Sequence, residues 1–421
     1  MASERLDFVI FGATGFTGKH AVQVAAQLVK ERQITFGVCG RRKQALEAVV
    51  KEFAPDIDVR IIVADLKDEE SLKKMTEQAK VLVNCCGPYR FYGEPVIKAC
   101  IATCTHQVDV SGEPQYIESI QLKYHKAAQE AGIYIVSACG FDSIPCDLGI
   151  IFTQEKFNGE VNSIETYLSF SSTAKVSGAI LHYGTYESAV YGVAHSDELR
   201  TIRNKLYSEK LPQLKPRLNR RGIIHQTSLS TGWSMIFPGA DRSVARRTQR
   251  YLYEKYKQRP VQVETYVTFK SLFTVLATII FGMIFMLLSK FEFGRNLLLK
   301  YPAFFSGGTV SREGPTAEVL ENSHFSIRFK AEGWTEKLAE PTDTHKDSPN
   351  KQLISKVSGV NPGYGGTCIM LLLSAMTILK ESDKIPENGG VMTPGAAFGK
   401  TSLIEELNKK DIRFEVVAQL E

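Results

Sequence analysis

The sequence predicts an α/β fold in which a Rossmann-type, doubly wound parallel sheet carries an inserted α+β domain and a membrane-embedding apolar segment. Three observations support this prediction. A glycine-rich turn joins the first apolar strand to a helix, strands and helices then alternate to about residue 150, and a long uncharged segment interrupts the second half. With 421 residues, the chain is long enough for two or three domains.

The glycine-rich turn lies between an apolar strand over 8–11 and a helix that starts at once. Glycines are needed here because the backbone turns tightly, approaches a pyrophosphate and lets the helix pack on the sheet. The free N–H groups at the helix start then bind the phosphates. A purely structural turn is the alternative, but the position between strand and helix favours nucleotide binding. The predicted contacts are Gly12, Thr14, Gly15, Phe16, Thr17 and Gly18.

The second strand, over 34–40, ends at Gly40 and is followed by Arg41 and Arg42. NAD-binding versions of this fold place an acidic residue here to bind the ribose 2′-hydroxyl, whereas arginine suits a 2′-phosphate. The alternative is that both arginines only face solvent at the start of a helix. The sequence therefore favours NADP, with NAD as the alternative cofactor.

Four further strands are predicted over 59–65, 81–89, 106–113 and 133–145, with helices between them. This alternation predicts a parallel sheet with right-handed crossovers, in which ligands lie beyond the carboxyl ends of the strands. The strand-end residues expected at the cofactor are Asp65 beside the adenine and Asn84, Gly87 and Pro88 beneath the nicotinamide ribose.

Several strings in this order resemble the saccharopine dehydrogenase family: GATGFTG, CGRR, NCCGPYRFYGEPVIKAC, DVSGEPQ and CGFDSIPCDLG. Together with GGVMTPGAAFGKTSLIEELNK they are most similar to its animal membrane-associated branch, the saccharopine dehydrogenase-like oxidoreductases. The resemblance spans nearly the whole chain and implies an NADP-linked oxidoreductase with a Rossmann domain and an inserted α+β domain. It also implies that relatives of this branch act on lipid-linked substrates or have no assigned substrate. Saccharopine itself is not expected, because no basic clamp for its carboxylates is recognisable.

Three domains are expected. Residues 1–150 form the NADP-binding Rossmann domain, 151–360 the α+β substrate domain with the apolar insert 271–306, and 361–421 C-terminal helices that return to the Rossmann domain. The segment 366–380 is predicted to be a buried helix beside the nucleotide site.

Finer predictions concern the second domain and the C-terminal segment. Strand-period alternation over 161–170, 261–269 and 323–334 predicts one antiparallel sheet. We expect one helix over 185–206, an exposed loop over 337–352 and a turn at 393–398.

The apolar insert is the second informative feature. Residues 271–289 carry no charge, and Lys270 and Lys290 close the two ends. This length is at the lower limit for a spanning helix, and a buried core helix is the alternative. The amphipathic stretch 291–308 follows. Because the family resemblance returns the C-terminal segment to the Rossmann domain, both flanks lie on one side, so the insert is expected to dip into a membrane and return.

Charge and cysteine content exclude some classes of function. The basic run over 242–259 lies just before the apolar insert, which favours anionic lipid headgroups over nucleic acid, with a solvated helix face as the alternative. The eight cysteines are scattered without a secretory signal, so free thiols in a reducing compartment are expected. No cysteine pair is matched by histidines, and no metal site is predicted.

No acid–base pair is recognisable, so the catalytic residue is not predicted from a motif. The candidate proton donors are Tyr89, Tyr92, Asp109, Glu113 and Asp142 at strand ends, and His182 in the second domain. Asp142 has the alternative role of capping the helix that follows it, and His182 that of a core histidine.

The expected function is an NAD(P)H-dependent oxidoreductase at a lipid surface, with hydride transfer to a hydrophobic or lipid-linked carbonyl or enoyl substrate. The alternative is a non-catalytic nucleotide-binding protein of a lipid droplet or membrane. The expected partners are a hydrophobic small-molecule or lipid substrate and a membrane or lipid-droplet surface. Nucleic acid is not expected as a partner, and the sequence leaves open whether the protein forms a homodimer. The expected location is the lipid droplet and the cytosolic face of the endoplasmic reticulum, with mitochondrial association as a further option.

Overall fold

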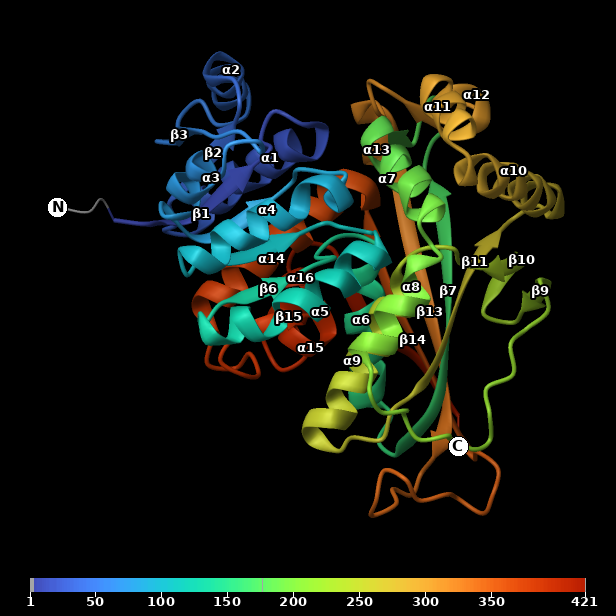
Figure 1. Cartoon of the computed structure of the whole chain (residues 1–421). Helices are drawn as coiled ribbons and strands as arrows, with labels where there is room; N and C mark the ends of the chain where they lie inside the picture. Colours follow the sequence, from blue (N-terminus) through green and yellow to red (C-terminus); the bar gives the residue numbers. More distant parts are fainter. Residues whose placement is uncertain (1–3, 176, 421) are drawn as a thin grey trace.

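The computed structural model describes residues 4–175 and 177–420. Its first sheet is parallel, in the order β15-β6-β5-β4-β1-β2-β3 (Figure 1). Apolar runs form these strands because helices cover both faces of the sheet. The strands are β1 (Leu6–Phe11), β2 (Phe36–Gly40), β3 (Arg60–Val63), β4 (Ala79–Asn84), β5 (His106–Asp109), β6 (Tyr134–Val136) and β15 (Gly390–Met392). The predicted doubly wound parallel sheet is confirmed, and β15 is an addition to it.

The helices of this half alternate with the strands. They are α1 (Phe16–Glu31), α2 (Lys43–Phe53), α3 (Glu69–Thr76), α4 (Tyr89–Ala102), α5 (Pro114–Glu130) and α6 (Ser143–Lys156). Helix α6 leads from the first sheet to the second and packs against β13, where a side chain at Gly149 would lie 2.2 Å from the Phe329 ring. The expected domain limit at residue 150 thus falls inside a helix that contacts both halves.

The second sheet is mixed, in the order β16-β14-β13-β7-β11-β10-β9. The prediction of a purely antiparallel sheet is wrong, because β7 pairs with β11 in parallel. The chain between these two strands is long and helical, which allows the crossover that parallel strands need. The strands are β7 (Glu160–Ser172), β9 (Ile224–Thr227), β10 (Ser230–Ile236), β11 (Gln262–Phe269), β13 (Ser323–Trp334), β14 (Lys351–Val360) and β16 (Arg413–Leu420).

The helices of the second half include α7 (Tyr183–Ala194), α8 (Glu198–Leu206) and α9 (Asp241–Tyr256). The prediction of a single helix over 185–206 is therefore wrong, because the chain bends between α7 and α8. In the bend, His195 Nδ1 contacts the Tyr191 carbonyl and the Ser196 hydroxyl donates to the Val193 carbonyl. Such side-chain bonds compete with helix continuation. In Figure 1, α8 and α9 lie on the face of the second sheet that is turned toward the Rossmann half. A small ribbon of β8 (Leu181–His182) and β12 (Val310–Ser311) completes this half.

The C-terminal segment contributes to both sheets. It holds a π-helical turn, η1 (Pro362–Gly366), and the helices α14 (Thr367–Lys380), α15 (Pro394–Phe398) and α16 (Leu403–Asn408). Helix α14 is buried against α1, β4 and β5, whereas β15 and β16 extend the first and second sheets. The turn predicted at 393–398 is a short helix, because Pro394 occupies its first position, where the absent N–H costs nothing.

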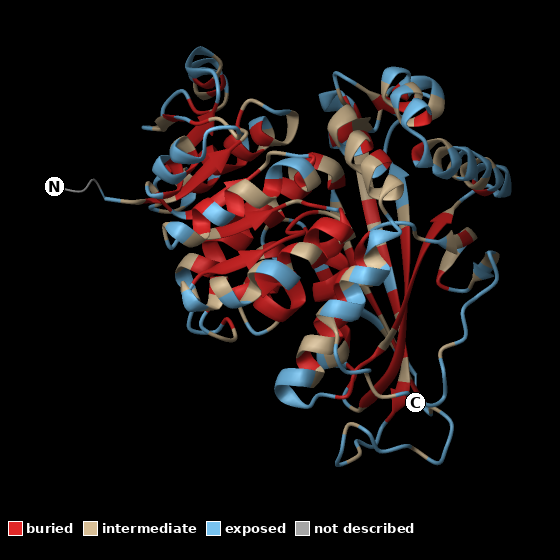
Figure 2. Cartoon of the chain, viewed as in Figure 1, coloured by how far each residue is buried: buried red, intermediate tan, exposed pale blue. Residues whose placement is uncertain are grey.

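The apolar insert forms α10 (Leu272–Lys290), followed by α11 (Glu292–Lys300) and α12 (Pro302–Phe305), with α13 (Ala317–Asn322) before β13. Two helical stretches among the described residues are long and apolar enough to cross a membrane, and they differ in burial. In the stretch 362–380, which ends with α14, 78% of the most apolar window is buried inside the protein. In α10 only 11% of the corresponding window is buried. Figure 2 shows α10 mostly exposed at the margin of the molecule. The alternative of a buried core helix is therefore wrong for α10.

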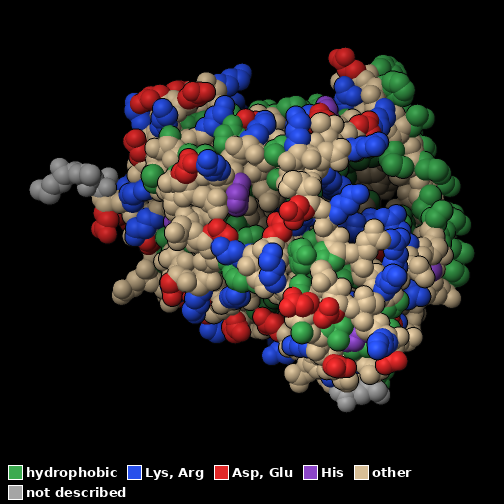
Figure 3. All heavy atoms as spheres, turned by 60° about the horizontal axis from the view of Figure 1, so that its bottom comes forward, with side chains coloured by type: hydrophobic (Ala, Val, Ile, Leu, Met, Phe, Trp, Pro, Cys, Tyr) green, Lys and Arg blue, Asp and Glu red, His purple; other side chains and the backbone are tan. Residues whose placement is uncertain are grey.

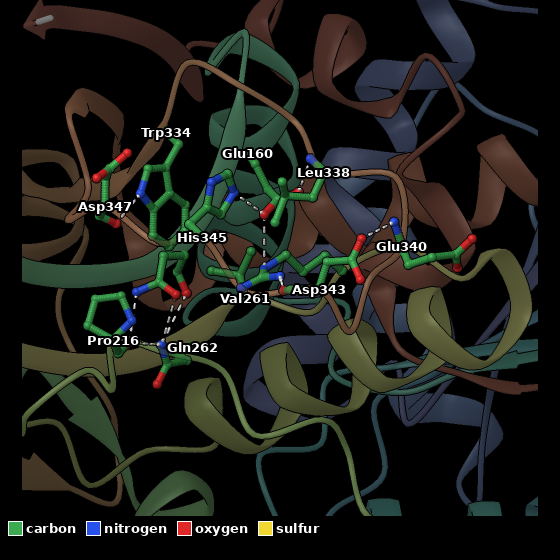
Figure 4. A network of polar contacts seen from close by, with 12 residues as sticks. Glu160, Pro216, Val261, Gln262, Trp334, Leu338, Glu340, Asp343, His345 and Asp347 are labelled. Carbon is green, nitrogen blue, oxygen red and sulfur yellow. Dashed lines mark hydrogen bonds and ion pairs between the residues drawn. The ribbon is translucent and has the colours of Figure 1, made fainter.

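A buried polar network holds the loop before β14 against the base of the second sheet (Figure 4). Glu160 accepts hydrogen bonds from the Leu338 main chain and contacts His345, and Arg259 lies 3.2 Å from the same carboxylate. The His345 ring stacks on Trp334 at 3.8 Å. The loop expected over 337–352 is present, but this network anchors it and buries His345.

Replacing Glu160 by Ala is expected to lower the free energy of unfolding by about 3 to 5 kcal/mol, because it leaves the buried Arg259 guanidinium without its partner. Denaturant unfolding followed by Trp334 fluorescence measures the loss. Glu336→Ala, exposed in the same loop, is the control and should change stability by less than about 0.5 kcal/mol. Equal stability of the two variants would contradict the structural role given to Glu160.

Candidate active site

A cavity of about 1710 Å³ lies between the two sheets. It is larger than a typical ligand pocket, so it has room for a dinucleotide and a sizeable substrate. The glycine turn, the ends of β4 and β6, helices α7 to α9 and strand β11 all contribute to its lining. Figure 3 shows a hollow bordered by Lys and Arg side chains, with hydrophobic side chains along the edge of the molecule beyond it.

The glycine turn has the geometry that a pyrophosphate requires. Gly12 has φ +82°, and a side chain there would lie 2.7 Å from Cys86 Sγ. A side chain at Gly18 would lie 2.1 Å from the Gly12 carbonyl oxygen, so only glycine lets α1 start this close to β1. Gly15 precedes α1 without a side-chain cap and lines the cavity together with Phe16 and Thr17. The uncapped helix start therefore faces the cavity and fits an anionic phosphate.

Asn84 ends β4 and is fully buried behind the cavity wall formed by Cys85 and Gly87. Its Oδ1 accepts a hydrogen bond from the Cys86 main chain, but its Nδ2 has no partner among the described residues. A buried amide donor without a partner is unusual, but Asn84 itself does not line the cavity. Gly87 lines the cavity and Pro88 precedes α4, so this wall fits the predicted nicotinamide end of the cofactor.

The adenosine end of the predicted site is more open. Arg41 and Arg42 follow β2 and are exposed. Burial raises the pKa of Cys86, and the charge of Arg41 opposes this rise. Asp65 accepts a hydrogen bond from the Lys67 main chain and so closes a local turn after β3. Thr14 lies close to Gly40, between the first two strand ends.

Three predicted proton donors have structural contacts instead. The Tyr89 hydroxyl donates to the Asn84 carbonyl, and burial raises its pKa. Asp109 is buried and accepts bonds from Ser111 and Ser137, which ties β5 to the end of β6. Glu113 accepts from the first two N–H groups of α4 and so caps that helix from another part of the chain. Tyr92 is exposed on α4.

Asp142 differs from these groups. It precedes α6 with φ +74°, makes no capping hydrogen bond and lines the cavity. The alternative of a helix cap is therefore wrong. Loss of hydration raises the pKa of Asp142 to about 7, and burial followed by repulsion from Asp142 raises the pKa of the neighbouring Asp241. A carboxyl group that keeps its proton near neutral pH is suited to general acid catalysis.

An aromatic cluster joins the glycine turn to the second half, and the sequence did not reveal it. The Phe16 ring stacks on His182 at 4.8 Å and meets the edge of Tyr364 at 4.5 Å. The His182 main chain donates to the Tyr364 hydroxyl, and a side chain at Gly314 would overlap the Phe16 ring. His182 Nδ1 accepts from the Gly184 main chain, and burial lowers its pKa. His182 therefore positions Phe16 as a neutral ring.

The basic run over 242–259 is mostly engaged within the protein. Arg242 and Arg246 contact Glu264, Arg247 bonds Gln121, Arg250 and Lys255 pair with Glu254 and Glu387, Arg259 contacts Glu160, and Lys257 lies over the Tyr253 ring. The run is therefore more than a solvated face, although Arg246 and Lys255 stay about half exposed, and its contact with lipid headgroups stays a prediction. Glu254 lies on α9 itself, whereas the other pairing carboxylates come from β7, β11 and the C-terminal segment. The eight cysteines are free thiols, as predicted.

Comparison with known proteins now adds the family. A model of the saccharopine dehydrogenase NADP-binding domain matches residues 8–136. A human saccharopine dehydrogenase-like oxidoreductase is 41% identical over 434 aligned residues that cover 100% of both chains. The chain belongs to this oxidoreductase family. Its cofactor domain is thus of the NADP-binding type.

Other relatives of this oxidoreductase are more distant. A Caenorhabditis elegans lipid droplet localized protein is 34% identical over 99% of both chains. A Mycobacterium tuberculosis protein provisionally named a trans-acting enoyl reductase is 27% identical over 95% of both chains. The solved structure of Saccharomyces cerevisiae saccharopine dehydrogenase (L-Glu forming) has 14% identity and a TM-score of 0.54, covering 98% of this chain and 99% of that one. That likeness shows a shared fold.

Replacing Gly15 by Val is expected to abolish NADPH binding, because the added methyl groups would enter the cavity where the phosphates bind. The fold should stay intact, because the nearest atom to the new Cβ would be the Gly12 carbonyl oxygen at 3.2 Å. Calorimetry measures binding, and far-ultraviolet circular dichroism measures folding. Gly18→Val is the contrasting variant and should unfold the protein more easily because of its 2.1 Å overlap. Normal NADPH affinity in Gly15→Val would contradict the phosphate position.

Replacing Arg41 by Asp is expected to remove a preference for NADPH over NADH, because a charge-assisted contact to the 2′-phosphate is lost and repulsion is added. The affinity ratio should fall about tenfold or more, as each charge-assisted hydrogen bond contributes about 1.5 to 3 kcal/mol. Lys43→Gln, on the same surface but paired with Glu47, is the control. If the unchanged protein binds both cofactors equally, Arg41 does not contact the 2′-phosphate.

Proposed function

We propose that the protein is an NADPH-dependent reductase at a lipid surface, acting on a carbonyl or enoyl group of a hydrophobic or lipid-linked substrate. One observation carries this proposal: a single cavity is lined at one end by the glycine turn and at another by Lys270, two residues before α10 begins. A substrate that leaves a lipid layer beside α10 would enter the cavity that holds the cofactor site. The names of the nematode and mycobacterial relatives support the lipid surface and the reductase chemistry, respectively.

The exposure of α10 supports the lipid surface. Large apolar side chains that are at least two-fifths exposed surround this helix, and a contiguous patch of this kind marks an interaction surface. They are Phe273, Leu276, Ile280, Phe281, Met283, Ile284, Met286 and Leu287, continued by Phe291, Phe293 and Phe304.

The attachment of α10 supports a segment that dips into one leaflet. Its inner edge packs through Phe285 and Leu288 on a small core of α7 and α11 residues, and Lys290 pairs with Asp197 beside α8. Strands β11 and β13, before and after the insert, belong to the same sheet. Both ends of the insert therefore lie in one sheet, which supports a dip into one leaflet over a single pass through a bilayer. A lipid droplet or the cytosolic face of the endoplasmic reticulum would suit such an element.

The proposed reduction adds a hydride to the electrophilic carbon and a proton to the carbonyl oxygen or, for an enoyl group, to the α-carbon. NADPH bound along the glycine turn supplies the hydride. Asp142 lies on the cavity wall, holds a proton up to about pH 7 and is the group that we assign to protonate the substrate. Phe16, held by His182 and Tyr364, keeps the glycine turn in place.

Replacing Asp142 by Asn is expected to lower turnover about 100-fold or more while NADPH affinity is kept, because the proton donor is lost. NADPH oxidation with trans-2-hexadecenal in phospholipid vesicles measures turnover, and the product tells carbonyl from enoyl reduction. In the unchanged protein the rate should fall as the pH rises through about 7. Asp147→Asn is the control, since Asp147 lies in the same buried group but bonds Thr248 and Gly395 away from the cavity.

Stability provides a second readout for Asp142. Its folded-state pKa is raised, so the folded protein loses stability as the pH rises from about 4 to about 7 and the charge has to be buried. Asp142→Asn should therefore be at least as stable as the unchanged protein at pH 8, although it turns over slowly. A variant that loses turnover only because it unfolds would contradict the catalytic role.

Replacing Phe281, Ile284 and Met286 together by Asp is expected to release the protein from lipid surfaces without changing its NADPH affinity. Burying an aspartate carboxylate in lipid is costly, and the three side chains lie outside the cavity. Flotation with phospholipid vesicles and with artificial lipid droplets measures the attachment. Val417→Asp with Leu420→Asp, exposed on β16, is the control. Unchanged flotation would show that another surface provides the attachment.

A further inference from the structure

Three arginines converge on one carboxylate in the wall of the cavity. Arg242 Nη2 and Arg246 Nη2 lie 2.9 and 3.1 Å from Glu264 Oε1, and Arg220 Nε lies 3.3 Å from the same oxygen. Arg242, Arg246 and Glu264 line the cavity, and Glu264 is buried on β11. Arg242 and Arg246 are one helical turn apart on α9, so their side chains reach the same side.

This cluster has more positive than negative charge. The neighbouring arginines do not share Glu264, because Arg203 is paired with Glu118 and Arg221 with Glu165. Burial and the charge of its arginine neighbours lower the pKa of Arg246, which means that the cationic form is disfavoured where it stands. Arg242 Nε is buried and has no hydrogen-bond partner among the described residues. An anion in the cavity would balance this charge and accept the remaining hydrogen bonds.

We propose that Arg242 and Arg246 bind the anionic group, a carboxylate or phosphate, of an amphipathic substrate whose apolar chain occupies the rest of the cavity. This inference rests on the proposed function, because it names the class of substrate for the same cavity. Arginine suits such a group, since its planar donors match the oxygens of carboxylate and phosphate.

The surroundings of the cluster fit the apolar chain. The cavity lining beside Arg242 and Arg246 includes Leu214, Leu218, Ile236, Phe237 and Val263. Asp142 lines the same cavity and interacts electrostatically with Asp241, the residue that precedes Arg242. The anionic group of the substrate would thus lie against α9, near Asp142. The apolar chain of the substrate would then place its reactive carbon beside the cofactor.

The test uses the full-length protein in a nonionic detergent, saturated with NADPH. Isothermal titration calorimetry compares octyl phosphate, octanoate and octanol, which share one chain and differ in the head group. Either anion should bind at least about tenfold more tightly than octanol, and the tighter of the two identifies the head group. Replacing Arg242 and Arg246 together by Gln should weaken the anion about tenfold or more and leave octanol unchanged. Lys255→Gln, on the same helix but paired with Glu387, is the control.

Glu264→Gln distinguishes a ligand site from a structural ion pair. It frees the arginines, so it should tighten binding of the anion and increase the thermal stabilisation that the anion provides. Equal binding of octanol and both anions, unchanged anion binding in the double variant, or no gain in Glu264→Gln would each overturn the proposal. If the double variant does not fold, as judged by NADPH binding, Glu264→Gln decides alone. The titrations involve no turnover, so they do not depend on whether the reductase activity is found.

Discussion

The pairing of the C-terminal segment with both sheets is the constraint on which the rest of the structure depends. Strand β15 adds to β6 of the first sheet, β16 adds to β14 of the second, and α14 is buried against α1, β4 and β5. These contacts fix the two halves at the walls of one cavity. Separately, the pairing of β11 and β13 with β7 places both ends of the apolar insert in one sheet.

The cavity brings together groups with separate chemical roles. The glycine turn fits a dinucleotide, burial raises the pKa of Asp142 to about 7, and Arg220, Arg242 and Arg246 share the single carboxylate of Glu264. Each role follows from burial, because loss of hydration raises the pKa of a carboxyl group and makes an unpaired donor costly. A hydrophobic substrate with an anionic end would satisfy all of these groups at once.

Local signals made the first half predictable. The strand, glycine turn and helix at 7–29 are contiguous in the sequence. The later strands are likewise apolar and alternate with helices, so the sequence alone predicted the parallel sheet. Long-range pairing was not predictable. The partners of the basic run, such as Glu264 and Glu387, lie on other elements, and the parallel pairing of β7 with β11 depends on a crossover that strand periodicity does not report. For the same reason Asp142 looked like a helix cap, and Phe16 gave no hint of its contact with His182.

The central claim is that this cavity transfers hydride from NADPH to a lipid-linked carbon. The most direct measurement incubates the protein with lipid-droplet or endoplasmic reticulum membranes and NADPH deuterated at the transferable position, followed by mass spectrometry of the extracted lipids. The account predicts one carbon-bound deuterium in a reduced lipid species, absent with Asp142→Asn. Full binding of NADPH with no deuterium in any lipid would contradict it and favour a nucleotide-binding protein without this chemistry.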